Sequence, residues 1–400
     1  METEKEVPQN EIIQKTPWRA LAAYWILGLC NNYGYVVMLS AANDILHKQT
    51  EQMTATKNIT NSTGNPERDC NYISTGAILL ADILPSLTIK FISAFLPFYV
   101  NVRVAICVFL ASGGFILVAF STQQWMSILG VVVTSLSSGL GEATFLQYSS
   151  FFDRDVISTW SSGTGGAGIA GALSYAALNA LGLRTALLIM LVVPVTMGIA
   201  FWIILPKPVK TYSSVVAQSK SKKLVFKEKL LLLPGLLQYM IPLGLVYLFE
   251  YFINQGMYEL INFENIFLDK AEQYRWLQVD YQVGVFISRS SVNILHIEKI
   301  WILSVFQFIN VILFTTEAIF YYIPSFWIVL ALTLWEGLLG GGAYVNTFYK
   351  ISTKTTEARK EFSLGMTSFA DAVGITLAGV FAILVHNSIC GLPKPQRFSI

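Results

Sequence analysis

The stretch KPVKTYSSVVAQSKSKKLVFKEK, which runs from Lys207 to Lys229, divides the chain into two parts. It holds seven lysines and no apolar run long enough to cross a bilayer, whereas long apolar runs follow one another on both sides of it. Six such runs precede the stretch and five follow it. Because a helix needs about 20 mostly apolar residues to cross the hydrocarbon core, the sequence predicts about eleven membrane-spanning helices in two groups.

Charged or proline-containing segments separate the predicted spans. The weakest span is 276–291, where Gln278, Asp280 and Gln282 interrupt an otherwise apolar run. The spans are 19–42, 73–98, 103–121, 125–150, 163–182, 184–206, 231–256, 276–291, 300–320, 323–348 and 363–389.

The composition also indicates a membrane protein. Of the 400 residues, 54% are hydrophobic and 13% are charged, whereas soluble domains carry about 25% charged residues. We therefore expect an all-α membrane protein with the two-lobed, six-plus-five bundle of a secondary transporter. In such folds the substrate site lies between the lobes near the bilayer midplane. Channels and receptors remain alternatives, since the number of helices does not establish transport.

The distribution of basic residues predicts the orientation. With the N-terminus in the cytosol, eighteen Lys and Arg side chains fall on the cytosolic side and eight on the other, which follows the positive-inside rule. The predicted segments are a cytosolic tail 1–18, a six-helix lobe 19–206 with a luminal loop 43–72, a basic cytosolic linker 207–230, a five-helix lobe 231–390 and a luminal tail 391–400.

Two N-glycosylation sequons, Asn58-Ile-Thr60 and Asn61-Ser-Thr63, lie in the loop that this orientation places in the lumen. The pattern is short and frequent by chance, so each sequon alone is a weak signal. Because the two are adjacent and agree with the charge distribution, we expect glycosylation at Asn58 and Asn61.

Ionisable side chains inside the predicted spans are the main functional evidence. A charge near the bilayer centre costs at least ~2.5 kcal/mol, so those that occur usually face a cavity or a partner. Residues three or four apart share a helix face, and Tyr247, Glu250 and Asn254 form one such polar face. The alternative is that the charged groups pair with one another and lock the bundle. The charged candidates are Asp82, Lys90, Glu142, Glu250, Glu336 and Asp371.

The sequence gives little support for catalysis. The four cysteines and three histidines show no metal-ligand spacing, and no Ser-His-acid set can be argued from their order. The stretch Ser161–Gly168 lacks the Lys-Ser/Thr ending of a phosphate-binding loop, so we interpret it, like Gly337–Gly342, as a site of close helix packing. We expect no enzyme activity, cofactor, metal ion or nucleic-acid partner, and an intramembrane hydrolase is the alternative.

Seven long and idiosyncratic stretches carry a resemblance that runs through nearly the whole chain. They are GLCNNYGYVVMLSAANDIL (28–46), LLADILPSLTIK (79–90), SSGLGEATFL (137–146), VISTWSSGTGGAGIAGALSY (156–175), VYLFEYFINQGMYEL (246–260), QYRWLQVDYQVGVFISRSS (273–291) and EGLLGGGAYVNTF (336–348). These stretches resemble the battenin family of lysosomal membrane proteins. The resemblance implies a multi-pass protein of lysosomes or late endosomes with a divergent major-facilitator fold, needed to clear glycerophosphodiesters from the lumen. Basic amino acid transport, control of luminal pH and a trafficking role are alternatives within the family.

The resemblance singles out Glu250 in EYFINQG, Arg289 in SRSS and Asp371 in FADAVG. We expect Glu250 to take up a proton in an acidic lumen, since burial disfavours its charge; a fixed partner such as Lys90 would make it a structural lock instead. The predicted substrate and proton pathway comprises Lys90, Glu142, Tyr247, Glu250, Asn254, Arg289, Glu336 and Asp371.

The expected substrate is a small molecule such as glycerophosphocholine, which carries a phosphate and a cationic head. Lys90 suits the phosphate, and Glu250 with Tyr247 suits the cation. A basic amino acid fits the same residues nearly as well. The rival hypothesis is a non-transporting scaffold that recruits trafficking adaptors through the cytosolic loops 207–230 and 350–362.

Three further features concern sorting and anchoring. Tyr212-Ser-Ser-Val215 fits a tyrosine sorting signal. Ten residues follow Cys390, so the C-terminal prenylation box of the family cannot be carried over. Cys70 and Cys390 both fall on the predicted luminal face and could form a disulfide there. Such a bond requires that their Cα atoms lie within about 7 Å of each other. The alternative is two free thiols.

Overall fold

The computed structural model describes residues 17–54, 68, 70, 75–179, 181–208, 226–264, 266–395 and 397. The described part is helical and contains no strand, which confirms the predicted all-α class. In chain order the elements are α1 (Trp18–Thr54), α2 (Thr75–Phe95), α3 (Val100–Ala119), α4 (Gln124–Ser149), α5 (Asp155–Asn179), α6 (Leu183–Met190), α7 (Val192–Ile199), the π-turn η1 (Ala200–Ile204), α9 (Phe226–Phe252), the π-turn η2 (Ile253–Met257), the 3₁₀ turn η3 (Tyr258–Leu260), α10 (Lys270–Arg289), α11 (Ile300–Phe320), α12 (Phe326–Lys354) and α13 (Glu357–Cys390).

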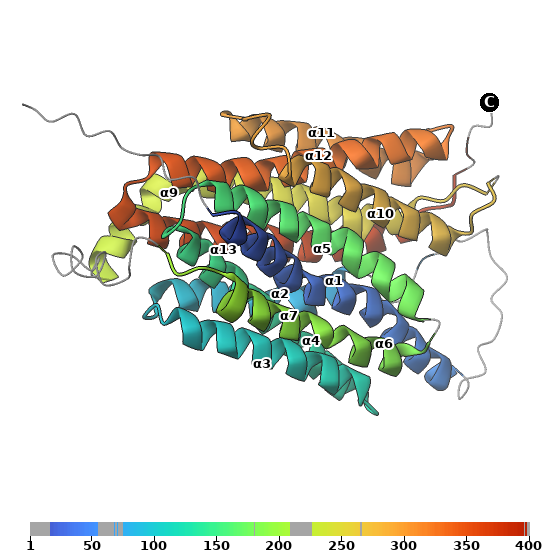
Figure 1. Cartoon of the computed structure of the whole chain (residues 1–400). Coiled ribbons are helices and arrows are strands. Elements are labelled where there is room, and N and C mark those ends of the chain that lie inside the picture. The colour runs from blue at the N-terminus through green and yellow to red at the C-terminus, as the bar shows by residue number, and fades with distance from the viewer. Residues whose placement is uncertain are drawn as a thin grey trace, which may run out of the picture.

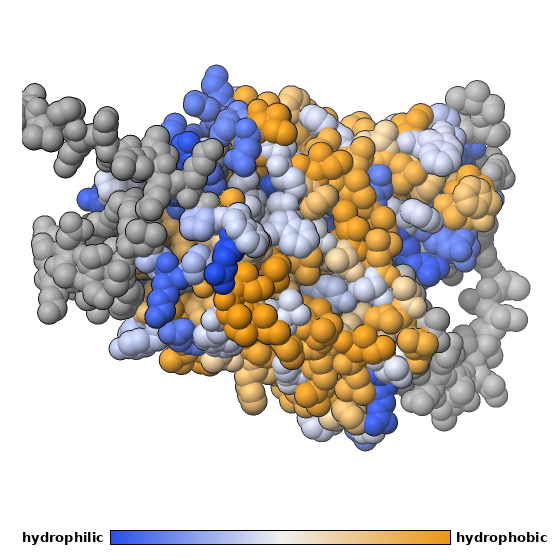
Figure 2. Space-filling view, in the orientation of Figure 1, coloured by the Kyte–Doolittle hydropathy of each residue, from blue (hydrophilic) through white to orange (hydrophobic). Residues whose placement is uncertain are grey.

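Seven helical segments of the described chain are long and apolar enough to cross a membrane. They are α3, α4, the continuous segment α6 to η1, the segment α9 to η3, α11, α12 and α13. The surface carries a broad apolar area between two ends rich in hydrophilic side chains, as Figure 2 shows. This pattern is the one that a multi-pass membrane protein requires.

The helices form two groups that correspond to the two parts of the chain, with α1 to α7 in the lower half of Figure 1 and most of α9 to α13 above them. Within the first group α1 packs on α5 and α3 packs on α4. Within the second group α13 packs on α9 and α10 packs on α12. Several contacts join the groups: α2 and α4 pack against α13, and α5 packs against α10 and α12.

Glycines permit the close approach of α1 and α5. A Cβ atom at Gly28 would collide with the backbone carbonyl of Trp160, and one at Gly163 would collide with that of Trp25. The stretch Ser161–Gly168 is therefore a packing surface, as its sequence indicated.

Several boundaries differ from those predicted. α12 continues to Lys354 rather than 348, and α13 begins at Glu357 rather than 363. The loop expected from residue 43 begins later, because α1 continues to Thr54. The fifth span begins at Asp155 rather than 163, and the linker expected to end at 230 gives way to α9 at Phe226. The weak eighth span begins earlier, at Lys270. Asp269 accepts a hydrogen bond from the Glu272 N–H there, and this capping box starts the helix before the apolar run that guided the prediction.

A disulfide joins Cys70 to Cys390, with their Cα atoms 6.2 Å apart. Cys70 precedes α2 and Cys390 ends α13, so the bond connects the two groups at one end of the bundle, called here the disulfide end. Arg397 binds Glu317 at 2.6 Å, and Arg68 donates to the carbonyls of Ala318 at 2.5 Å and Ile319 at 2.7 Å. The segments around both cysteines are thus also held to the end of α11.

Candidate functional site

A buried charge cluster lies where α2, α4 and α13 meet. The Lys90 ammonium on α2 is 2.6 Å from Glu142 on α4 and 2.9 Å from Asp371 on α13. The three side chains are 3%, 9% and 6% exposed, respectively. One positive charge therefore faces two carboxylates in a nearly water-free position, and the cluster has an excess of one negative charge when both carboxylates are ionised.

The helix contacts explain why these side chains meet. Gly139 lets α4 approach α2 closely, because a Cβ atom there would lie 2.6 Å from the Ser86 hydroxyl oxygen. Glu142 comes three residues after Gly139, and Lys90 comes four residues after Ser86, so each lies on the contacting face of its helix.

Tyr344 on α12 extends the cluster across the bundle. Its hydroxyl donates to the Glu142 carboxylate at 2.7 Å and accepts from the Trp160 indole N–H at 3.2 Å. The Tyr344 hydroxyl thus has both a hydrogen-bond acceptor and a hydrogen-bond donor, which a buried phenol needs within an apolar interior. The contact ties α4 and α5 of the first group to α12 of the second.

Arg289 on α10 supplies a second cation. Its guanidinium donates to the hydroxyls of Thr164 and Tyr247, both at 2.7 Å, and lies over the Tyr344 ring, 4.3 Å from the centroid. Its Nε atom is buried without a hydrogen-bond partner. Among the ion pairs of the described residues, none includes Arg289. Glu250 interacts with Arg289 electrostatically, at a longer range than an ion pair. Because the hydrogen bonds of the guanidinium go to neutral hydroxyls, it retains its capacity to bind an anion.

The cluster and Arg289 line the same polar cavity, whose volume is about 50 Å³. Five predicted residues border it: Lys90, Glu142, Tyr247, Arg289 and Asp371. Because α1, α2 and α4 contribute from one side of the chain and α9, α10, α12 and α13 from the other, the cavity lies between the two groups of helices.

The sequence did not single out several residues that border this cavity. Tyr35 on α1 and Tyr251 on α9 face each other with hydroxyl oxygens 3.5 Å apart, and the Tyr251 ring stacks on Tyr247 at a centroid distance of 6.0 Å. Tyr344 and Asn32 also border the cavity. Tyrosines in apolar runs resemble ordinary core residues, and the one available signal is that a buried hydroxyl needs a partner.

Three predicted pathway residues lie outside the cavity lining. Glu250 accepts a hydrogen bond from Tyr281 on α10 and packs against Gly340 on α12. Glu336 accepts from Tyr258 at 2.5 Å. Asn254 lies in the π-turn η2, and its side-chain oxygen has no partner. Of the predicted polar face of Tyr247, Glu250 and Asn254, only Tyr247 borders this cavity.

The remaining predicted residues lie away from the polar cavity or outside the described part of the chain. The glycosylation sites Asn58 and Asn61 and the sorting signal Tyr212 to Val215 lie outside the described residues. Cys70, Cys390 and His386 come together at the disulfide end in an arrangement that metal ions use, but both sulfurs are bonded to each other.

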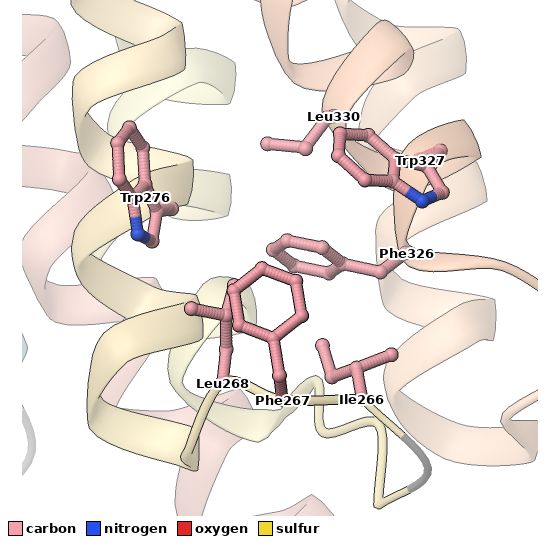
Figure 3. Close-up of a pocket in the computed structure, with 7 residues that line it drawn as sticks. All are labelled: Ile266, Phe267, Leu268, Trp276, Phe326, Trp327 and Leu330. Carbon is pink, nitrogen blue, oxygen red and sulfur yellow. The ribbon is translucent and has the colours of Figure 1, made fainter.

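A larger cavity of about 210 Å³ lies near the disulfide end, at the beginnings of α10 and α12. In Figure 3, Trp276, Phe326, Trp327 and Phe267 point toward one another from these helices and the loop before α10. Every side chain that lines it is apolar or aromatic, so it offers no charge to a polar substrate. The smaller polar cavity is therefore the candidate substrate site.

Comparison with known proteins agrees with this architecture. The chain matches the sequence profile of the CLN3 protein family over residues 22–223 and 209–392. The chain belongs to the CLN3 protein family. Battenin of Canis lupus familiaris is 42% identical over 406 aligned residues, which cover 94% of this chain and 92% of the canine protein. Protein BTN1 of Yarrowia lipolytica is 35% identical, with 92% and 94% covered. These matches confirm the battenin resemblance.

The fold is that of a major-facilitator transporter. The crystal structure of the human organic anion transporter MFSD10 (TETRAN) superposes with a TM-score of 0.55 at 12% identity, and covers 93% of this chain and 96% of the human chain. Family and fold together support a multi-pass membrane protein with a transporter-like fold.

Proposed function

We propose that this protein exports glycerophosphodiesters such as glycerophosphocholine from the lysosomal lumen, coupled to protons. One observation carries the proposal: a polar cavity between the two lobes has a cation, Arg289, that forms no ion pair within 4 Å among the described residues, and a cluster with excess negative charge around Lys90. The two are linked through Tyr344.

The two charged regions fit the two ends of such a substrate. Arginine binds phosphate oxygens through parallel N–H donors, so Arg289 is assigned to the phosphodiester. The sequence predicted that Lys90 binds the phosphate. Because Lys90 is paired with two carboxylates, we assign phosphate binding to Arg289 instead. The carboxylates of Glu142 and Asp371, with the tyrosines around the cavity, suit the cationic head.

The cavity volume requires a conformational change. Ligand sites usually measure roughly 300 Å³ or more, whereas this cavity measures about 50 Å³. A substrate therefore enters only after the lobes separate, as alternating access by rocking of the lobes demands. The contacts of α2 and α4 with α13, and of α5 with α10 and α12, are among those that such a motion opens.

Proton coupling is assigned to the charge cluster rather than to Glu250. One proton bound to Glu142 or Asp371 would leave the cluster with one positive and one negative charge, which is less costly inside a bilayer. Glu250 lies among α9, α10 and α12 of one lobe and suits the structural lock that was its alternative role.

The lumen is assigned to the disulfide end. Disulfides persist in oxidising compartments, and eighteen of the basic residues fall on the opposite side by the predicted orientation. A hydrogen bond from Lys394, together with its charge, lowers the pKa of the exposed Glu264 at the disulfide end, so this pair stays ionised in an acidic lumen. The battenin resemblance supports the proposed lysosomal location.

A basic amino acid is the second candidate substrate, because its carboxylate suits Arg289 and its side chain suits the acidic cluster. A trafficking scaffold that uses Tyr212 to Val215 to bind adaptors is the non-transport alternative. A scaffold has no need of charges buried between its lobes, and this favours transport.

Binding by purified protein in lipid vesicles tests the assignment. Arg289→Gln should weaken glycerophosphocholine binding by about 10- to 100-fold, since hydrogen bonds to charged groups contribute about 1.5–3 kcal/mol. Arg275→Gln, which removes an exposed arginine of the same helix, is the control and should bind as the wild type does. Arginine should compete weakly; stronger binding of arginine than of glycerophosphocholine would favour the amino acid reading. If Arg289→Gln and Arg275→Gln bound glycerophosphocholine equally well, the assignment of the phosphate site to Arg289 would be contradicted.

A further inference from the structure

Asp82 on α2 is a buried carboxylate that the cluster does not use. Its side chain is fully buried, with no exposed surface. Both carboxylate oxygens lack any hydrogen-bond partner. α2 packs between α4 and α13, two helices long enough to span the membrane. An ionised carboxylate without a partner is strongly disfavoured there, whereas a protonated carboxyl is far less costly.

Among the described residues, the groups around Asp82 provide no cation to stabilise its charge. Tyr35 on α1 interacts electrostatically with it, and a phenol carries no positive charge. On α4 and α13, Glu142 and Asp371 are held by Lys90. The π-turn η2, which also contacts α2, contains no titratable residue.

α2 is continuous through Asp82, but a proline and an inserted serine hydroxyl alter its backbone hydrogen bonding there. Pro85 lies within α2 and cannot donate a backbone hydrogen bond. The Ser135 hydroxyl on α4 accepts from the backbone N–H of Ser86 at 3.2 Å and donates to the backbone carbonyl of Asp82. It thus bridges two groups that a regular helix joins directly. Prolines and inserted side chains are the usual causes of helix bending, so α2 has a built-in bending point beside the orphan carboxyl.

Asp82 also lies between the disulfide end and the charge cluster. Cys70 and the start of α2 at Thr75 are at the disulfide end. With a rise of about 1.5 Å per residue, Asp82 is roughly 10 Å along the helix from Thr75, and Lys90 is roughly 12 Å further. Both Asp82 and Lys90 lie on one face, because they are eight residues apart with Ser86 midway.

We propose that Asp82 is a proton-binding site, the first acceptor on the path from the disulfide end to the Lys90 cluster. In the closed conformation its carboxylate holds one proton as a carboxylic acid. When the lobes part and α2 bends at Pro85, the carboxyl meets water at the disulfide end and exchanges that proton. This inference rests on the proposed function for the direction of flow, but the proton site is testable without any substrate.

Infrared spectroscopy of the full chain in lipid vesicles tests it directly. The spectrum of the wild type minus that of Asp82→Asn should contain the carbonyl band of a protonated carboxylic acid, and this band should shift after transfer to heavy water. Asp155→Asn, which alters an exposed acid at the other end of the bundle, should remove no such band. Asp82→Glu should keep a carboxylic acid band at a changed frequency, and it serves as the second variant if Asp82→Asn fails to fold.

Absence of the band would show that Asp82 is ionised, and a band that never shifts in heavy water would show that its proton does not exchange. Either result would overturn the proposal. Wild-type protein that shows the exchangeable band but binds no glycerophosphodiester would instead contradict the proposed function and leave the proton site intact.

Discussion

Lys90 and Asp371 form a two-point ion pair between the lobes, with the ammonium 2.9 and 3.1 Å from the two carboxylate oxygens. The residues are separated by 281 positions and belong to α2 and α13. Any motion that parts these helices must break or transfer this pair, so it connects the charge state of the cavity to the arrangement of the lobes.

Removal of Lys90 should destabilise the protein. Lys90→Met leaves two buried carboxylates without their cation, and loss of one partner of a buried pair typically costs about 3–5 kcal/mol. We expect a clearly lower melting temperature in detergent for this variant. In the double variant Lys90→Met/Asp371→Asn only one buried carboxylate remains without a cation. It should therefore recover part of the stability that Lys90→Met loses. A single variant as stable as the wild type would mean that the pair is not buried as described.

Removal of one acid of the cluster, unlike removal of Lys90, should leave the stability of the protein nearly unchanged. Asp371→Asn leaves Lys90 and Glu142 as a neutral pair, so we expect near wild-type stability. Because the excess charge is gone, uptake of glycerophosphocholine should lose its dependence on pH. A pH profile in vesicles, compared with that of Asp155→Asn, measures this effect. An unchanged profile would remove Asp371 from the coupling step.

The cluster shows what the sequence could and could not predict. Lys90, Glu142 and Asp371 were found because a charge in a long apolar run is costly. Their partnership was not predictable, since the pairing depends on how α2, α4 and α13 pack.

Asn254 and Glu250 depart from the predicted polar face for two different reasons. The predicted polar face assumed regular helix from Tyr247 to Asn254, but the helix changes to a π-turn at Ile253. That change shifts the positions that follow. Glu250 itself is directed to α10 and α12 by contacts with Tyr281 and Gly340, which only the packed structure reveals.

The disulfide should contribute to stability. Cys70→Ser removes the link between the start of α2 and the end of α13, and loss of a disulfide typically costs about 2–4 kcal/mol. A reductant should lower the melting temperature of the wild type and leave Cys70→Ser unaffected. Cys30→Ala, at a buried free thiol, should keep the response to reductant. Identical melting of the wild type with and without reductant would argue against the bond.

Glycosylation should report the orientation. Enzymatic deglycosylation should increase the gel mobility of the wild type and leave Asn58→Gln/Asn61→Gln unchanged, because the sequons are modified only if their loop enters the lumen. If neither protein shifts, the sites are unused or the orientation is inverted. The single variants would show which of the two asparagines carries the glycan.

Transport driven by a pH gradient tests the central claim most directly. Purified protein is reconstituted in vesicles loaded with labelled glycerophosphocholine, and efflux is followed with the interior acidic or at the pH of the outside solution. The account predicts efflux that an acidic interior accelerates, that an ionophore which collapses the gradient slows, and that Arg289→Gln abolishes while Arg275→Gln does not. Efflux that is equal with and without the gradient and is unaffected by Arg289→Gln would contradict it.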